Sequence, residues 1–303
     1  MTSHVGLGGR ALIMAIPYLW LAFFFLIPFL IVLKISLSDD VLAQPPYAPI
    51  LDFATGWAGL LEFVTALDFE NYAFVLTDPL YVQSYLQSVA IAGLSTLILM
   101  LVGYPIAYAM ARSPLAWRPI LILLVILPFW TSFLIRIYAW MGILAREGIV
   151  NQLLVRLGLT HEPLDLLATN SAVVLGIVYS YLPFMVLPLY AALDRQDESL
   201  LEAAADLGAS PGKSFWLVTF PLSVPGLIAG ALLCFIPAVG EFVIPDLLGG
   251  SDTLMIGRTL WTEFFANRSW STASVIAVLL LIVLVVPMVL YQNIQARSLE
   301  AGR

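Results

Sequence analysis

Glu241 is the clearest carboxylate within the long apolar segments of this 303-residue chain. Burying an ionisable residue in a membrane segment is costly, so such residues usually serve a function. Pro237 and Gly240 precede it and are expected to interrupt the helix, turning backbone carbonyls toward a cavity. A carboxylate beside open carbonyls suits a cationic ligand. The alternative is an ion pair with Arg136, which the predicted topology places at a similar depth.

Aromatic and acidic residues elsewhere in the chain are further candidates for the path of a cationic ligand. Aromatic faces attract ammonium groups, and the candidates are Trp130, Tyr138, Tyr179, Tyr181 and Trp261. The alternative for each ring is a place in the core or in the interfacial aromatic belt. Asp246 and Asp252, with the acidic segment after the first apolar run, would make an electronegative outer mouth.

Several other residues imitate catalytic or metal sites. Gly208-Ala209-Ser210-Pro211-Gly212 has the G-x-S-x-G spacing of a hydrolase. The only histidines, His4 and His161, are expected at the terminus and in an outer loop, so no catalytic triad is expected. The same segment has three residues between its glycines where a P-loop has four, so ATP binding by this chain is not expected. Neither His161 nor the single Cys234 has metal-ligand neighbours at suitable spacing.

The composition excludes an ordinary soluble protein. Hydrophobic residues make up 61% of the chain and charged residues 11%, whereas soluble domains carry roughly 25% charged residues. The formal net charge of -7 argues against nucleic acid or anionic lipid as the main partner, because both require a basic face. A cationic ligand fits this balance better.

The elements that must position these residues are membrane helices. A span needs about 20 apolar residues to cross roughly 30 Å of hydrocarbon. Six segments qualify and predict an all-α, polytopic protein embedded in a lipid bilayer: 11–33, 86–111, 119–140, 172–193, 222–247 and 273–294. Prolines inside several spans predict kinked helices.

Lysine and arginine density predicts the orientation. The segment 38–83 lacks both residue types and is acidic, so it is expected outside. The side opposite to this segment has the higher density of positive residues and is therefore expected to be cytoplasmic. Both termini are expected on that side, which holds seven positive residues: Arg10, Arg112, Arg118, Arg195, Lys213, Arg297 and Arg303.

No internal repeat is visible, so residues 1–303 are predicted to form a single membrane domain with a core at about 84–294. The outer loop 38–83 contains many aromatic residues, which predicts that it packs against something. Either the helical bundle itself or a docking partner on the outer face would satisfy this expectation.

The composition of the cytoplasmic loop 194–221 predicts a short amphipathic helix. Alanine, leucine and glutamate favour helix, and Gly208 suits a C-terminal cap. Its apolar face consists of Leu200, Ala203, Ala204 and Leu207. This face is expected either to seat in a groove of another protein or to pack beneath its own bundle, with Glu202 closing a capping box on Ser199.

This loop also carries a family motif. Glu202-Ala203-Ala204 is followed by Gly208 six residues after the glutamate and by Pro221 after a further thirteen. The pattern resembles the EAA loop of binding-protein-dependent ABC importer permeases. Val218 and Phe220 stand where family members often have isoleucine and leucine, which preserves the apolar character.

The resemblance extends along nearly the whole chain. The segments 28–37, 130–136, 237–245 and 255–258 look like those of polyamine importer permeases, in particular putrescine permeases. It implies the type I ABC importer permease fold, in a bacterial inner membrane. The implied partners are a second homologous permease, two ATPase subunits and a periplasmic polyamine-binding protein. ATP and Mg would bind the ATPase, so this chain would hold no cofactor and would not be an enzyme.

The resemblance also implies roles for residues of the loop. The EAA helix of this family seats in a cleft of the ATPase, and the matching residues here are Glu202, Ala203, Ala204, Asp206, Gly208 and Pro221. Small alanines would permit close seating, and the acids would pair with donors on the ATPase.

Three alternatives stay open: an importer for another solute, an autonomous proton- or sodium-coupled transporter, and an intramembrane serine protease that uses Ser210.

Overall fold

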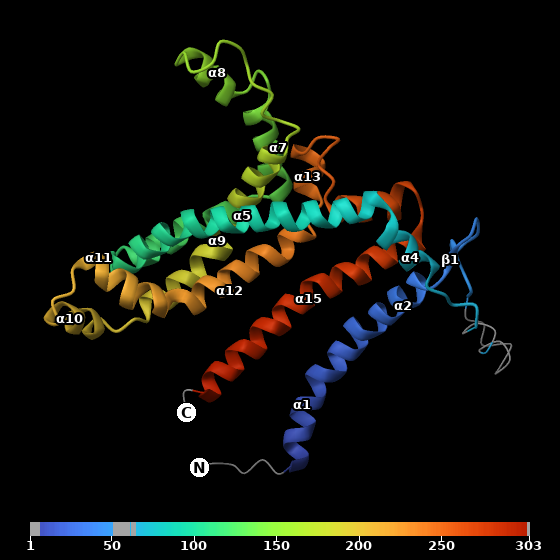
Figure 1. Cartoon of the computed structure of the whole chain (residues 1–303), viewed down its shortest axis with the longest axis horizontal. Coiled ribbons are helices and arrows are strands. Elements are labelled where there is room, and N and C mark those ends of the chain that lie inside the picture. Colours follow the sequence, from blue (N-terminus) through green and yellow to red (C-terminus); the bar gives the residue numbers. More distant parts are fainter. Residues whose placement is uncertain (1–6, 51–60, 62–64, 302–303) are drawn as a thin grey trace. The chain divides into compact units, whose positions relative to one another are not determined.

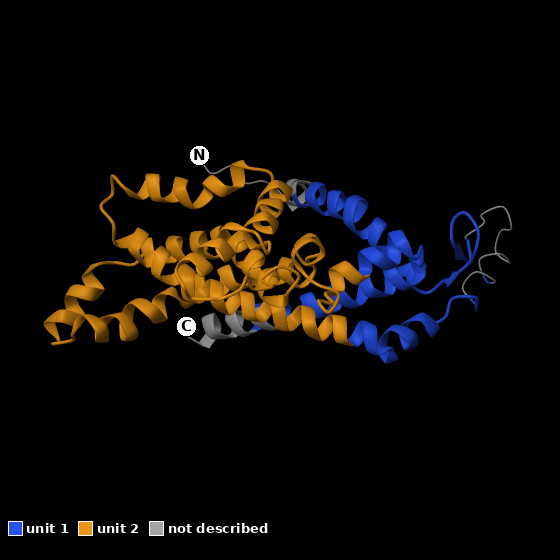
Figure 2. Cartoon of the chain, turned by 90° about the horizontal axis from the view of Figure 1, so that it is seen from above, with its two compact units in different colours: residues 1–82, 260–303 blue, residues 83–259 orange. Residues whose placement is uncertain are grey.

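The computed structural model describes residues 7–50, 61 and 65–301. These residues are mostly helical, and the strands among them are the short antiparallel pair β1 (Asp39–Asp40) and β2 (Tyr47–Ala48). The predicted all-α class is confirmed. Residue contacts divide the chain into two compact units, Met1–Val82 with Leu260–Arg303 (unit 1) and Gln83–Thr259 (unit 2), as Figure 2 shows. The single membrane domain stays a prediction.

Unit 2 contains Glu241, the candidate residues other than Trp261, and the predicted cytoplasmic loop 194–221. Its helices, in chain order, are α5 (Pro79–Arg112), α6 (Arg118–Ile126), η3 (Leu127–Trp130), α7 (Phe133–Leu144), α8 (Ile149–Arg156), α9 (Asn170–Asp194), α10 (Ser199–Asp206), α11 (Pro211–Ser214), η4 (Phe215–Thr219), α12 (Phe220–Val239), α13 (Val243–Leu248) and α14 (Ile256–Trp261). α5 begins and α14 ends just across the boundary with unit 1.

The core of unit 2 lies where α9 and α12 pack along each other (Figure 1). Gly226 and Gly230 of α12 face α9, and a Cβ added at Gly226 would lie only 2.4 Å from the Ala192 Cβ. One added at Gly230 would lie 3.0 Å from the Met185 carbonyl oxygen. Small residues therefore let the two helix backbones approach closely, as their four-residue spacing predicts.

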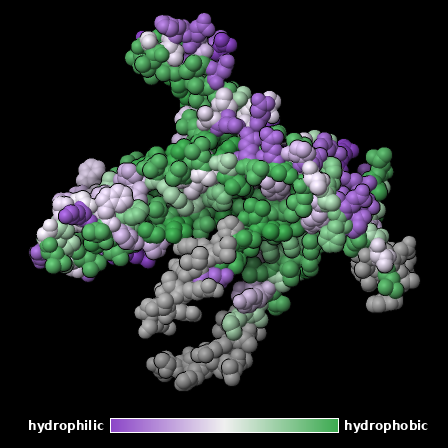
Figure 3. Space-filling view, in the orientation of Figure 1, coloured by the Kyte–Doolittle hydropathy of each residue, from purple (hydrophilic) through white to green (hydrophobic). Residues whose placement is uncertain are grey.

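The described helices agree with a membrane protein. Four helical segments are long and apolar enough to span a bilayer: Met14–Ser36, Pro79–Arg112, Asn170–Asp194 and Pro211–Val239. The pair Arg118–Trp130 and Phe133–Arg156 would make a fifth span, and the apolar stretch Trp270–Val286 lies at the sixth predicted position. In Figure 3 the surface over α5 is largely apolar, whereas polar residues gather over α8 and near α10. Six spans are consistent with these elements.

The predicted span 119–140 is broken rather than continuous. Its two helices meet at an angle of 86° around Thr131 and Ser132. A 3-10 turn containing Pro128 precedes the break, and Thr131 and Ser132 are extended. Proline cannot donate a helical hydrogen bond, which favours such an interruption.

Unit 1 combines helices from the N-terminal and C-terminal parts of the chain. α1 (Leu7–Leu21), η1 (Ala22–Leu26) and α2 (Ile27–Ser36) follow one another without a break, and α2 packs along α15 (Trp270–Ala301), as Figure 1 shows. The helix α4 (Glu70–Thr77) also packs on α15. The remaining element, η5 (Thr262–Ala266), precedes α15.

The described part of the predicted outer loop packs on its own unit. Asn71 of α4 donates a 2.8 Å hydrogen bond to the Ser38 carbonyl, and the Ser36 and Tyr72 hydroxyls lie 2.7 Å apart. These contacts favour the bundle over an external partner as the support of this part of the loop. Residues 51–60 and 62–64 of the loop lie outside the described residues.

Candidate functional site

The Glu241 carboxylate lies at a break in a membrane helix. α12 ends at Val239 and α13 begins at Val243, so the expected interruption at Gly240 is confirmed. The Tyr181 hydroxyl donates to Glu241 Oε2 at 2.7 Å, while Oε1 lies 3.1 Å from the Val243 amide nitrogen. A third donor, the Ile244 amide, lies 3.4 Å from Oε1. These donors are neutral, and among the described residues no cationic side chain pairs with the carboxylate.

Arg136 does not form the alternative ion pair with Glu241 among the described residues. Its side chain, on α7, is 9% exposed, and its guanidinium lies over the rings of Phe129 at 5.3 Å and Phe133 at 5.8 Å. Its Nε has no hydrogen-bond partner in the part of the chain that the structure describes. The interpretation of Glu241 as one half of a structural ion pair is therefore wrong.

Of the five candidate rings, Tyr181 hydrogen-bonds Glu241. Tyr179 instead packs edge-on against Trp140, with ring centroids 5.4 Å apart. Trp130 and Tyr138 are 72% and 56% exposed. Trp261 belongs to unit 1, where it packs against Phe265. A role in cation transport stays a prediction for all five.

The carboxylates of the expected outer mouth differ in their surroundings. Asp246 pairs with Arg258 at 3.3 Å, and Arg258 also donates to the Gly250 carbonyl at 2.9 Å. Asp252 is exposed, and its backbone carbonyl accepts a hydrogen bond from Gln87. Because its charge is partly neutralised, Asp246 contributes less to an electronegative field than its sequence position suggests.

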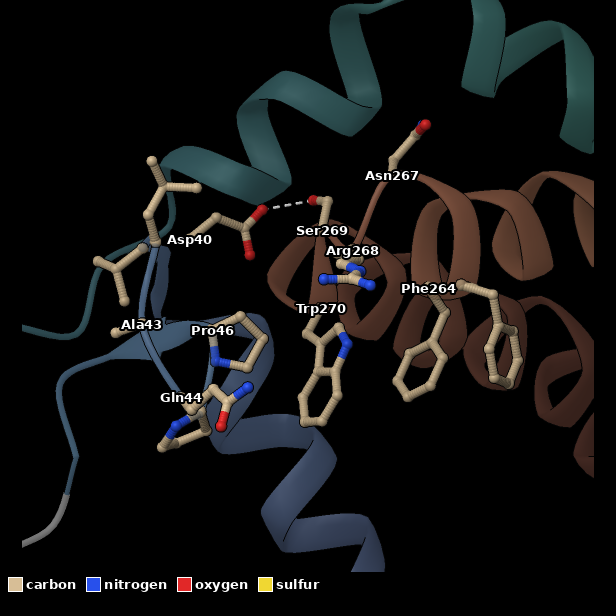
Figure 4. A pocket seen from close by; sticks show the side chains of 13 residues that line it. Asp40, Ala43, Gln44, Pro46, Phe264, Asn267, Arg268, Ser269 and Trp270 are labelled. Atoms are coloured by element: carbon tan, nitrogen blue, oxygen red, sulfur yellow. Dashed lines mark hydrogen bonds between the residues drawn. The ribbon is translucent and has the colours of Figure 1, made fainter.

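The cavity in Figure 4 lies within unit 1 and has a volume of about 1140 Å³. The carboxylate of Asp40 accepts hydrogen bonds from the Ser269 hydroxyl and, at 3.0 Å, from the Ser271 amide. Trp270 stacks on Phe264 with centroids 5.1 Å apart. Asp40 therefore caps the start of α15, which gives this carboxylate a structural role.

Sequence reasoning missed Glu263. It is 7% exposed in η5, where Oε1 accepts from the Tyr81 hydroxyl at 3.1 Å and Oε2 from the side-chain amide of Asn267 at 3.0 Å. Glu263 lies outside the six predicted spans, so the rule that an ionisable residue within a membrane span is functional does not select it. The aromatic residues Trp261, Phe264 and Phe265 flank Glu263 in the sequence, and this cluster indicates that the segment packs against other residues.

Leu201 and Ala204 of α10, the helix in the predicted cytoplasmic loop, are half-buried, and its other residues are exposed. All its residues are described and none is buried; Leu200 is 45% exposed, and Leu207, which directly follows the helix, is 89% exposed. This exposure disfavours packing beneath its own bundle. At its start, Asp197 Oδ1 accepts a 2.9 Å hydrogen bond from the Ser199 amide, and the hydrogen bonds from Ser199 lower the pKa of Asp197. Asp197, rather than the proposed capping box of Glu202, satisfies this donor.

Gly208 ends α10 as expected. Its φ is +79°, in the left-handed region, and the Ala209 amide donates to the Ala204 carbonyl at 3.0 Å. This arrangement is a Schellman cap, which glycine favours because it has no Cβ. The Gln196 side chain closes the loop base by donating to the Thr219 carbonyl at 2.9 Å. Pro221 lies in the first turn of α12.

The segment with hydrolase-like G-x-S-x-G spacing has the wrong surroundings for a hydrolase. Ser210 directly precedes α11 and follows α10, so it lies between two helices. A nucleophile elbow joins a strand to a helix. The local structure therefore gives no support to the serine protease alternative.

Comparisons with known proteins identify the family. The sequence model of the protein family described as binding-protein-dependent transport system inner membrane component matches residues 100–300 of this chain. The spermidine/putrescine transport system permease protein PotB of Haemophilus influenzae is 41% identical over 87% of this chain and 86% of its own length. The protein of the same name from Escherichia coli is 42% identical over 77% of this chain and 84% of its own.

Solved structures give the same fold. A bacterial ABC transporter involved in the import of alginate aligns with a TM-score of 0.68 over 95% of this chain and 96% of its own, at 16% identity. These likenesses confirm the predicted importer permease fold, and the relatives are permeases rather than enzymes. The chain is therefore a multi-pass inner membrane permease that belongs to the family of binding-protein-dependent transport system inner membrane components.

Proposed function

We propose that this chain is one permease subunit of an ATP-driven polyamine importer, with putrescine as the expected substrate. The observation that carries the proposal is the Glu241 carboxylate, held by neutral donors at the break between α12 and α13. The names of the PotB relatives, which include both spermidine and putrescine, support the same substrate class.

A polyamine supplies the cation that Glu241 lacks. A hydrogen bond to a charged group contributes about 1.5–3 kcal/mol, so an ammonium paired with this carboxylate would strengthen binding by about 10- to 150-fold. The Tyr181 hydroxyl orients the carboxylate by donating to Oε2. The backbone carbonyls of Gly240 and Glu241 face Gly257 closely, so the side chain, rather than these carbonyls, is the expected ligand.

The exposed helix α10 is proposed to couple this permease to its ATPase. Glu202, Ala203 and Asp206 are exposed on α10, and Gly208 ends the helix sharply. Coupling requires the ATPase to bind the two conformations of the permease with different affinity, since equal contacts would shift no equilibrium. Two ATPase subunits would bind ATP and Mg, and this chain would bind neither.

The remaining proposed partners are a second homologous permease and a periplasmic polyamine-binding protein. One structural neighbour is a bacterial alginate ABC transporter in complex with its alginate-bound periplasmic protein, which supports an equivalent partner here. The proposed orientation has both termini in the cytoplasm, together with α10 and the positive residues that flank it, Arg195 and Lys213.

The test is uptake of radiolabelled putrescine by proteoliposomes that contain the complete transporter. Glu241→Gln removes the charge and keeps the shape, so the half-saturation concentration should rise about 10-fold or more. The matched control is Glu162→Gln, which makes the same change at an exposed loop residue. Unchanged uptake by Glu241→Gln would refute the assigned role of Glu241, and spermidine competition would measure the preference between the two amines.

A further inference from the structure

Gly257 of α14 lies directly against the helix break that carries Glu241. It is buried, and an added Cβ would lie 2.3 Å from the Gly240 carbonyl oxygen and 2.6 Å from that of Glu241. Both neighbours are backbone atoms, so they cannot move aside as a flexible side chain would. Only glycine permits α14 to approach the break this closely.

α14 is itself attached to α5. The Ile256 amide donates to Ser88 Oγ at 2.7 Å, and the Ser84 and Thr259 hydroxyls lie 3.1 Å apart. Ser84 and Ser88 are fully buried, and their four-residue spacing puts them on one face of α5. α14 is thus fixed on one side to a long membrane helix and contacts the Glu241 backbone on the other.

A third attachment joins α14 to the segment after the break. Arg258 pairs with Asp246 of α13 and donates to the Gly250 carbonyl. The residues on both sides of Glu241 are therefore held by α14, while Tyr181 of α9 holds its carboxylate. The backbone position of Glu241 depends on where α14 lies.

We propose that Gly257 is a positioning residue for substrate recognition. α14 holds the Gly240–Glu241 backbone at a fixed distance from α5, and this distance sets the position of the carboxylate. The inference rests on the proposed role of Glu241 as the ligand of an ammonium group. A movement of α5 would be transmitted through Ser88 and Gly257 to the substrate site.

A methyl group at Gly257 should displace the carboxylate without removing its charge. Non-bonded heavy atoms prefer separations of about 3.5–4.0 Å, so the contact of 2.3 Å must open by about 1 Å or more. A linear diamine binds at two points separated by its carbon chain, so moving one point changes the chain length that fits best. General damage to the fold would instead reduce uptake of all amines by the same factor.

The experiment compares putrescine with cadaverine, which has one more methylene group, in the complete transporter. Gly257→Ala should raise the half-saturation concentration for putrescine on the order of 10-fold and change the putrescine-to-cadaverine preference. Gly93→Ala is the matched control, because an added Cβ there has no atom within 4 Å among the described residues. An unchanged preference in Gly257→Ala would overturn the proposal.

Ser88→Ala provides a second test, which is decisive if Gly257→Ala does not assemble. It removes the acceptor of the Ile256 amide and should change the same preference more weakly; an unchanged preference would then overturn the proposal. Glu241→Gln is measured in parallel. Normal uptake by Glu241→Gln would refute the role of Glu241 on which this inference rests, whereas impaired uptake by Glu241→Gln with a normal Gly257→Ala would refute only the positioning role.

Discussion

Replacement of Gly208 tests whether the shape of α10 serves coupling to an ATPase. At φ +79°, this residue has a backbone conformation that disfavours a Cβ. The left-handed conformation costs an L-residue roughly 1–2 kcal/mol, and asparagine tolerates it better than alanine. Gly208→Ala should therefore destabilise the cap, and Gly208→Asn should do so less.

The expected effect on ATPase binding follows from this energy. If the ATPase binds only the capped form of α10, destabilising that form by about 1–2 kcal/mol weakens binding by up to about 5- to 30-fold. Gly212→Ala is the matched control, because an added Cβ there meets nothing within 4 Å among the described residues and its φ is not positive.

The assay is titration of the solubilised permease complex with its ATPase, followed by ATP hydrolysis stimulated by the loaded binding protein. The expected order of affinity is wild type and Gly212→Ala, then Gly208→Asn, then Gly208→Ala. Equal affinity of Gly208→Ala and wild type would refute the reasoning. An equal loss in Gly212→Ala would show that the loop responds to any added side chain rather than to the left-handed backbone.

Two further predictions concern the contacts of α9. Tyr181→Phe removes the hydroxyl that orients Glu241, so the half-saturation concentration for putrescine should rise about fivefold, from roughly 1 kcal/mol; no change would contradict an orienting role. Gly226→Ala places a Cβ 2.4 Å from that of Ala192, and overpacking of this kind costs about 1–3 kcal/mol. Its melting temperature in detergent should fall below that of Gly93→Ala, and equal values would contradict the close packing of α9 and α12.

The membrane architecture was predictable because it depends on features that a sequence displays directly. Apolar runs of sufficient length indicate helices, and Gly226 and Gly230 indicate close packing at their spacing. The cap at Gly208 was predictable for a similar reason, since a single residue type satisfies a local backbone requirement.

The break at Thr131 and Ser132 was not predictable in the same way. Hydropathy summed over a window measures whether residues prefer lipid, and it contains no information on the direction of the chain. Pro128 indicated an irregularity, but its consequence depends on the neighbouring helices that re-satisfy the freed backbone groups.

The hydrogen-bond partners of Glu241 could not be predicted from the sequence either. Topology gives the depth of Arg136 and Glu241 but not the direction in which either side chain points around its helix. The Arg136 guanidinium lies over the rings of Phe129 and Phe133, and the Tyr181 hydroxyl donates a hydrogen bond to Glu241. The contact of Gly257 with the break depends on tertiary packing across seventeen residues of chain and had no local indication.

The most direct test of the central claim is ATP-dependent uptake of radiolabelled putrescine by proteoliposomes. These would contain the complex purified through a tag on this chain, with the loaded binding protein outside and ATP inside. Uptake that requires ATP, the ATPase subunits and the binding protein is the predicted result. Uptake by this chain alone without ATP, or a complete complex that transports no polyamine, would contradict the account.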